Sequence, residues 1–296
     1  MKSGIINVYK EAGFTSFDVI AKLRGILKIR KIGHTGTLDP DATGVLPICI
    51  GKATKICDLL TDRDKTYRAV MRLGIVTDTL DMSGNVLETN AVNVTEEEVK
   101  SAIMSFVGDI MQIPPMYSAL KVNGQKLVDL ARKGQVVERK PRPVTIYDIN
   151  VEEVALPLVT FTVSCSKGTY IRTLCDDIGQ KLGCGACMES LERIKAAGFT
   201  VENAMTLSDI EAIRDAGDLD SIILSIDEAL KEYPKVVARD GCTKILQNGG
   251  KVLAGDLIQV DSSADLVRMY MADDTFVGIY ERTGDIYKPN KMFLEA

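Results

Sequence analysis

The segment from residue 33 to residue 47 constrains the fold more than any other part of this sequence. It reads Gly-His-Thr-Gly-Thr-Leu-Asp-Pro-Asp-Ala-Thr-Gly-Val-Leu-Pro. Its three glycines and two prolines interrupt regular structure, so we expect a shaped loop and neither a helix nor a strand interior. The loop contains His34, the only histidine of the chain, and Asp39, which precedes a proline. A polar loop between apolar runs is a usual place for chemistry.

Length and composition leave room for one large domain and a smaller one. The chain has 296 residues, of which 46% are hydrophobic and 26% are charged, an ordinary globular composition. No apolar run reaches the roughly 18–20 residues that span a bilayer. The first ten residues lack the apolar core of a signal peptide. We therefore expect a cytoplasmic protein without a membrane partner.

Seven cysteines are scattered along the chain, mostly among apolar neighbours, which predicts reduced thiols in the core. Cys184 and Cys187 form a C-x-x-C pair, but no second pair follows and His34 is remote in the sequence. A zinc or redox site needs such partners. We therefore expect no metal site.

Charge is distributed unevenly along the chain. The net charge of −5 disfavours a polyanionic partner. Two stretches are nevertheless basic: residues 22–31 carry five Lys or Arg and no acid, and residues 121–142 carry seven against two acids. Such stretches are compatible with phosphate binding and equally with solvated helix faces. Charge alone does not decide between the two interpretations.

Hydrophobic periodicity predicts both strands and helices. Strands are predicted over residues 5–9, 48–51, 65–73, 144–154 and 158–165. Helices are predicted over 17–27 with Ser16 as the N-cap, over 52–60, from a capping box at Thr95, and over 126–133, 169–182 and 186–195. The segment 112–120, with two adjacent prolines, is expected to be irregular. This mixture predicts an α+β domain.

The composition shifts around Tyr233 and Pro234, and the remaining residues contain short strands separated by glycine turns. These strands are predicted over 251–253, 257–260, 266–270 and 276–280. We therefore divide the chain into a domain over residues 1–232 and a small β-barrel-like module over residues 233–296.

With these residues laid out, segment 33–47 resembles the catalytic signature of the tRNA pseudouridine synthase B (TruB) family. Further motifs of this family are matched in the same order, at residues 10–16, 65–67, 114–124, 165–174 and 191–193. The resemblance covers about residues 4 to 200, and the C-terminal module resembles the PUA RNA-binding domain. It implies a pseudouridine synthase fold, with a mixed, largely antiparallel sheet flanked by helices and an RNA-contacting insertion at about residues 112–143.

The resemblance also implies an activity. The enzyme would isomerise uridine to pseudouridine at position 55 in the T arm of tRNA, and would assist tRNA folding as well. The reaction breaks an N-glycosidic bond and rejoins the base through C5 without redox change, so no cofactor is expected. Family members are expected to be monomers that require no protein partner.

Roles for individual residues follow from the matched motifs. Asp39 is the expected nucleophile or electrostatic catalyst, since aspartate can attack covalently. Without the neighbouring residues of segment 33–47, Asp39 would be interpreted as an ordinary turn residue before a proline. Arg172 is its expected partner, because an arginine favours the ionised carboxylate. Tyr67 would stack on the target base and assist proton transfer at the sugar. Tyr170 and Leu191 would line the uracil pocket, which suits a base flipped out of its helix.

His34 is expected to contact the RNA where the flipped nucleotide has left, and not to act as a general base. A Ser-His-Asp hydrolase would need a serine partner, and the sequence has no Gly-x-Ser-x-Gly elbow. The matched insertion suggests that Arg139, Lys140 and Arg142 bind the RNA backbone.

Two alternatives remain open. One is an RNA-binding or tRNA-folding factor without catalysis, against which the presence of Asp39, Tyr67 and Arg172 argues. The other is the catalytic subunit of a guide-RNA ribonucleoprotein. The segment from Pro114 to Lys121 favours the stand-alone branch of the family over this second alternative.

Overall fold

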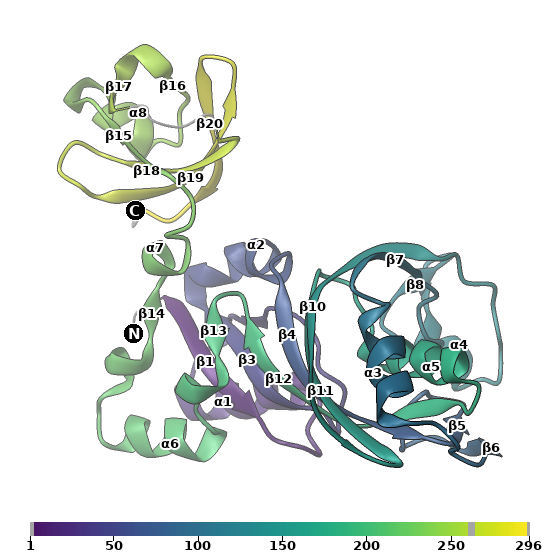
Figure 1. The fold of residues 1–296 in the computed structure, drawn as a ribbon. Coiled ribbons are helices and arrows are strands. Elements are labelled where there is room, and N and C mark those ends of the chain that lie inside the picture. The colour runs from purple at the N-terminus through teal and green to yellow at the C-terminus, as the bar shows by residue number, and fades with distance from the viewer. Residues whose placement is uncertain (1–2, 260–263, 295–296) are drawn as a thin grey trace.

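Two separate β-sheets organise the chain (Figure 1). The computed structural model describes residues 3–259 and 264–294. The larger sheet has ten strands and forms the centre of the main body, and the smaller has six strands and forms a module at the C-terminal end. The expected fold class, an α+β body followed by a barrel-like module, is confirmed.

The larger sheet is mixed but largely antiparallel. Its order is β14-β1-β3-β12-β4-β11-β10-β7, with β2 beside β3 and β13 beside β12. Only β3 and β12 pair in parallel; the other ladders of this sheet are antiparallel. The strands are β1 (Gly4–Lys10), β2 (Ile32–His34), β3 (Thr43–Ile50), β4 (Lys65–Leu73), β7 (Gly108–Gln112), β10 (Arg142–Ala155), β11 (Leu158–Cys165), β12 (Ala186–Ala196), β13 (Phe199–Thr200) and β14 (Leu224–Ser225).

Helices cover the two halves of this sheet with separate cores. One core joins the buried face of α1 to β1 and β3 through residues such as Leu23, Val8 and Ile48. The other joins α3 and α5 to β4, β10 and β11, with Phe161 and Leu174 fully buried. The helices are α1 (Ser16–Leu27), α2 (Cys57–Thr61), α3 (Glu96–Met104), α4 (Leu127–Ala131), α5 (Ile171–Leu182), α6 (Leu207–Asp215), α7 (Ile226–Ala229) and α8 (Thr243–Gln247). Two further pairs of strands form separate two-stranded sheets: β5 (Ile75–Thr77) with β6 (Val86–Thr89), and β8 (Lys121–Val122) with β9 (Gln125–Lys126).

Two local predictions about helix α1 and segment 33–47 need correction. The N-cap of α1 is Thr15 and not Ser16, because Thr15 forms a reciprocal capping box with Asp18. Segment 33–47 is a loop only over residues 35–42, since residues 43–47 already belong to β3. Gly44 makes this possible: its φ is +103°, and a Cβ there would come within 2.3 Å of the Arg193 carbonyl on the parallel neighbour β12.

The predicted helix over residues 186–195 is wrong, because this segment is strand β12. It lies in the middle of the sheet between β3 and β4, and its backbone pairs with both strands. This pairing stabilises a strand although the apolar residues have a helical spacing. A strand covered on both faces does not alternate cleanly between apolar and polar residues. The consecutive buried residues Ala186, Cys187 and Met188 show this.

The C-terminal module is a six-stranded sheet of order β16-β20-β19-β18-β15-β17, consistent with a PUA-like fold. Its strands are β15 (Lys235–Ala238), β16 (Val252–Leu253), β17 (Leu257–Gln259), β18 (Leu266–Tyr270), β19 (Phe276–Thr283) and β20 (Ile286–Met292). Strands β15 and β20 were not predicted, and residue 260 of the predicted strand 257–260 lies outside the described residues. Ile279 and Phe293 pack against Leu230 of the main body, so the module is attached through a buried apolar contact.

Candidate active site

The loop that carries Asp39 is held on both sides by buried polar side chains. Lys10, at the end of β1, is fully buried and its Nζ donates to the carbonyls of Pro40, at 2.8 Å, and Ala42, at 2.5 Å. The backbone N–H of Leu38 donates to Oγ of Ser16 at 3.0 Å. These bonds flank Asp39 directly, so the loop presents its carboxylate from a fixed backbone.

Arg172 binds the Asp39 carboxylate through two of its guanidinium nitrogens. Its Nε lies 3.0 Å from Oδ2, and its Nη2 lies 3.3 Å from Oδ1. This is the bidentate fork geometry that only arginine provides. The guanidinium also donates to the carbonyls of Thr79, at 3.1 Å, and Tyr117, at 2.8 Å, and lies 3.6 Å from the carboxylate of Asp81. The expected pairing is therefore present, and Arg172 also links it to two further segments of the chain, residues 79–81 and Tyr117.

Burial and Arg172 shift the pKa of the Asp39 carboxyl in opposite directions. Burial raises the pKa of the Asp39 carboxyl, because it disfavours the charged form, and the nearby Asp81 adds to the effect. The Arg172 guanidinium lowers the same pKa, and the net direction is upward. The carboxylate keeps 40% of its side-chain surface exposed while Arg172 keeps 6%, so the open side of the pair is that of the carboxylate.

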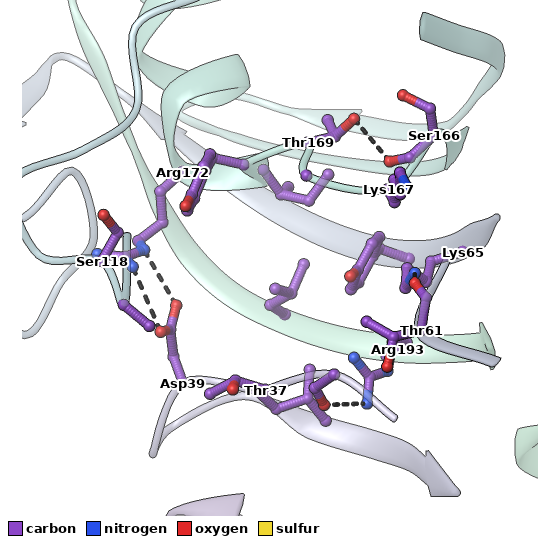
Figure 2. A pocket seen from close by; sticks show the side chains of 18 residues that line it. Thr37, Asp39, Thr61, Lys65, Ser118, Ser166, Lys167, Thr169, Arg172 and Arg193 are labelled. Atoms are coloured by element: carbon purple, nitrogen blue, oxygen red, sulfur yellow. Dashed lines mark hydrogen bonds and ion pairs between the residues drawn. The ribbon is translucent and has the colours of Figure 1, made fainter. Parts of the chain in front are cut away.

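A cavity of about 270 Å³ opens beside this pair, and Figure 2 shows Asp39 and Arg172 on one side of it with Lys65 and Arg193 on the other. Tyr67, Tyr170 and Leu191 line the same cavity. They come from β4, from the N-cap of α5 and from β12 respectively. The structure thus brings together five of the predicted site residues from four different parts of the sequence.

Two cations of this cavity were not assigned to the site from the sequence, although both lie in matched motifs. Arg193 is 1% exposed, and it donates to the carbonyls of Val45, at 2.7 Å, and Gly36, at 3.3 Å. Burial raises the pKa of Tyr67, and the adjacent Arg193 opposes this shift. Burial and Arg193 together lower the pKa of Lys65 to about 8. The wall of the cavity beside Tyr67 is therefore electropositive.

Gln112 is a further residue that sequence reasoning missed. It is 1% exposed at the end of β7, and its side-chain amide meets the backbone of Tyr170 twice. The Tyr170 N–H donates to Oε1 at 3.0 Å, and Nε2 donates to the Tyr170 carbonyl at 3.2 Å. The start of the expected insertion is thereby tied to the wall of the cavity. Glutamine at a strand end carries no recognisable signal in a single sequence.

His34 lies beside the cavity and does not line it. Its Nδ1 accepts a hydrogen bond from the backbone N–H of Gly36 at 3.3 Å, so the neutral ring carries its proton on Nε2. Burial lowers the pKa of His34, and the positive charge of Arg193 lowers it further. The ring meets that of Phe17 edge to face, with centroids 5.7 Å apart.

The three basic residues expected on the RNA backbone also lie outside the cavity lining. Lys140 and Arg142 are exposed. Arg139 is half-buried, and its Nη1 donates to the Pro114 carbonyl at 3.0 Å, so this residue also supports the insertion itself. Within the described residues, no group of three or more His, Cys, Asp or Glu could hold a metal ion. No helix in that part of the chain is long and apolar enough to cross a membrane.

Comparison with known families agrees with this geometry. The model described as TruB family pseudouridylate synthase (N terminal domain) matches residues 24–171, and the tRNA pseudouridylate synthase B C-terminal domain matches residues 172–231. The chain belongs to the TruB family. Its relatives include the tRNA pseudouridine synthase B proteins of Lachnoclostridium phytofermentans, 52% identical over 307 residues, and Clostridium novyi, 47% identical over 292 residues. Both alignments cover 99% of this TruB-family chain and 100% of the relative.

Solved structures share the fold of this TruB-family chain. A chain of a Cbf5-Nop10-Gar1 complex matches with a TM-score of 0.78 and 28% identity, over 98% of this chain and 85% of that chain. A chain of an H/ACA RNP bound to a substrate RNA containing 2'-deoxyuridine matches with a TM-score of 0.76 and 26% identity, over 99% and 85%.

Proposed function

We propose that this chain is a tRNA pseudouridine synthase that isomerises the uridine at position 55 of the T arm. The observation that carries the proposal is the bidentate pair of Asp39 and Arg172 at the wall of a cavity lined by Tyr67, Tyr170 and Leu191. A carboxylate, a ring and an apolar wall are the groups that this isomerisation needs.

In the proposed mechanism Asp39 acts on the flipped uridine as a nucleophile or as an electrostatic catalyst. Both of its oxygens are engaged by Arg172, but each retains a further lone pair, and the exposed part of the carboxylate is open to the substrate. The bond between C1′ and N1 breaks, the base turns, and C1′ bonds to C5. C5 then loses its proton and N1 takes one up, so the step is a balanced isomerisation. The proposal assigns Tyr67 to stacking on the base. Arg193, which is adjacent to Tyr67, donates to the Gly36 carbonyl of the loop.

The base would be held by stacking and by apolar contact. Aromatic rings with apolar walls suit a base that has left its helix. Tyr170 is fixed through its backbone by Gln112, so its position is set before RNA binds. His34, Lys140 and Arg142 lie outside the cavity, and the proposal assigns them to the surrounding RNA. The residue boundary near 232, a monomeric state and a cytoplasmic location belong to the same proposal.

The second candidate, a catalytic subunit that needs a guide RNA and partner proteins, is favoured by the fold match to the chain in the Cbf5-Nop10-Gar1 complex. The full-length relatives at 47–52% identity favour the stand-alone enzyme.

One experiment separates the candidates. The purified chain is incubated with an unmodified tRNA transcript and no guide RNA, and pseudouridine is mapped along the RNA. We expect product at position 55 with the wild type and none with Asp39→Ala. Binding without product would support a folding factor, and product only after addition of a guide RNA would support the ribonucleoprotein subunit.

A further inference from the structure

Phe17 is the most exposed aromatic side chain of the described residues, with 69% of its surface accessible. It lies in the first turn of α1, and its ring meets His34 at an interplanar angle of 88°. Nothing in the fold requires a large apolar ring at this point, because the core face of α1 is formed by other residues. An exposed ring next to the catalytic loop is available to stack on an unpaired base.

The start of α1 is fixed relative to the catalytic loop. The neighbour of Phe17, Ser16, binds the backbone of Leu38 next to Asp39. The capping box of Thr15 and Asp18 holds the first turn of the helix, because the backbone N–H of each residue donates to a side-chain oxygen of the other. His34 is held by Gly36, and its lowered pKa leaves the ring neutral at pH 7. Two neutral rings thus stand in fixed positions at the edge of the loop.

The face of α1 that begins with Phe17 continues as a basic surface. Residues 17, 21 and 24 share one helix face by their spacing, and Arg24 on this face is exposed. Lys28, also exposed, is the C-cap residue directly after α1. At 1.5 Å per residue, Lys28 lies about 16 Å along the axis from Phe17. Arg30 and Lys31, also exposed, follow before β2 returns the chain to His34.

These cations are not used by the fold as ion pairs. In the parts of the chain that the structure describes, no ion pair involves Arg24, Lys28, Arg30 or Lys31. Arg24 makes one hydrogen bond, from Nε to the Arg30 carbonyl at 3.3 Å. The carboxylate of Asp18, in the first turn of α1, accepts the hydrogen bond of the capping box and pairs with none of these cations. These cations are therefore available to an anionic partner, although the net charge of the protein is −5.

We infer that the outer face of α1, from Phe17 to Lys28 together with Arg30 and Lys31, binds the substrate RNA in continuity with the active site. Phe17 stacks on a base next to the target nucleotide, and the cations bind phosphates of the same RNA. This inference rests on the proposed function, because it takes tRNA as the occupant. An RNA fits this surface better than an apolar protein partner, since one ring is followed by four unpaired cations.

The stacking contact is tested with substitutions at Phe17. Binding of a fluorescently labelled, unmodified tRNA transcript is measured by anisotropy, and pseudouridine formation is followed in single turnover. Base–aromatic stacking is worth enough to predict that Phe17→Ala weakens binding by about five- to a hundredfold. Phe17→Tyr keeps the ring and should restore binding, whereas Phe17→Leu should not. Leu87→Ala, in the exposed strand β6, is the matched control for the loss of an exposed apolar side chain.

The phosphate contacts are tested by the salt dependence of the same binding constant. The double variant Arg24→Gln and Lys28→Gln should lower the slope of log K against log salt by about 0.7–0.9 for each phosphate that is no longer neutralised. Lys100→Gln with Lys181→Gln removes the same charge from α3 and α5 and should leave the slope unchanged.

The outcomes distinguish this inference from the proposed function. If the wild type forms no pseudouridine, the proposed function fails. If the wild type is active but Phe17→Ala binds as the wild type does, or the α1 double variant keeps the wild-type salt slope, the inference is overturned. Weaker binding by Phe17→Ala that Phe17→Tyr restores, with a flatter slope for the double variant only, supports it.

Discussion

Substitutions of Arg172 distinguish the contribution of its bidentate geometry to the reaction rate from the contribution of its positive charge. Arg172→Lys keeps a positive charge but cannot reach both carboxylate oxygens, which the guanidinium meets at 3.0 and 3.3 Å. A hydrogen bond to a charged group is worth about 1.5–3 kcal/mol. If the missing bond aligns Asp39 for attack, the rate of the chemical step should fall about ten- to a hundredfold, since about 1.36 kcal/mol corresponds to tenfold.

Arg172→Met removes the charge as well and leaves the Asp39 carboxylate, which is 40% exposed, without its ion-pair partner. The chemical step should then be slower still. Because Arg172 lowers the pKa of Asp39, its removal should raise that pKa further, so the acid limb of the rate profile moves to higher pH. Single-turnover pseudouridine formation is measured across pH, with tRNA binding as the control for folding. A wild-type rate for Arg172→Lys, or an unmoved acid limb for Arg172→Met, would refute this reasoning.

Three further predictions follow from the contacts around the loop and the insertion. Ser16→Ala leaves the Leu38 N–H without a hydrogen-bond partner, so the free energy of unfolding measured in urea should fall by about 1–3 kcal/mol. An unchanged free energy of unfolding would contradict the assigned contact. The pKa of His34 lies below its ordinary value, so the ratio of tRNA affinities of His34→Gln and wild type should stay constant above about pH 6.5, and a change there would show that the ring titrates. Lys140→Glu with Arg142→Glu should weaken tRNA binding and flatten its salt dependence, and an unchanged slope would identify a solvated face. Arg139 is kept out of that variant because it also holds the Pro114 carbonyl.

Regular elements were predictable where one periodicity dominates. Strands β4 and β11 and helix α5 occupy nearly their predicted ranges, because each has one clearly apolar face. Strand β12 was predicted as a helix because its burial is decided by β3 and β4 on either side, which are remote in sequence. Strand β3 begins inside the expected loop because Gly44 allows a close approach to Arg193 that no local pattern reveals.

The site was predictable to the extent that its residues lie in recognisable motifs. The pairing of Asp39 with Arg172 was predicted from the family resemblance and is present in the structure. The contacts that hold the catalytic loop and the cavity wall were not predicted, because Ser16, Gln112 and Arg193 are buried polar residues whose partners lie far along the chain. A buried polar group is stable only with such partners, and a single sequence does not identify them.

The central claim is that Asp39 performs the isomerisation, and it is tested most directly by two isosteric substitutions in the same loop. Asp39→Asn and Asp41→Asn each remove one negative charge, but Asp41 is exposed and makes no ion pair with the residues that the structure describes. Pseudouridine formation at position 55 is followed with excess enzyme over unmodified tRNA. The account predicts no product with Asp39→Asn and the wild-type rate with Asp41→Asn. Product formation by Asp39→Asn at a rate near that of the wild type would contradict it.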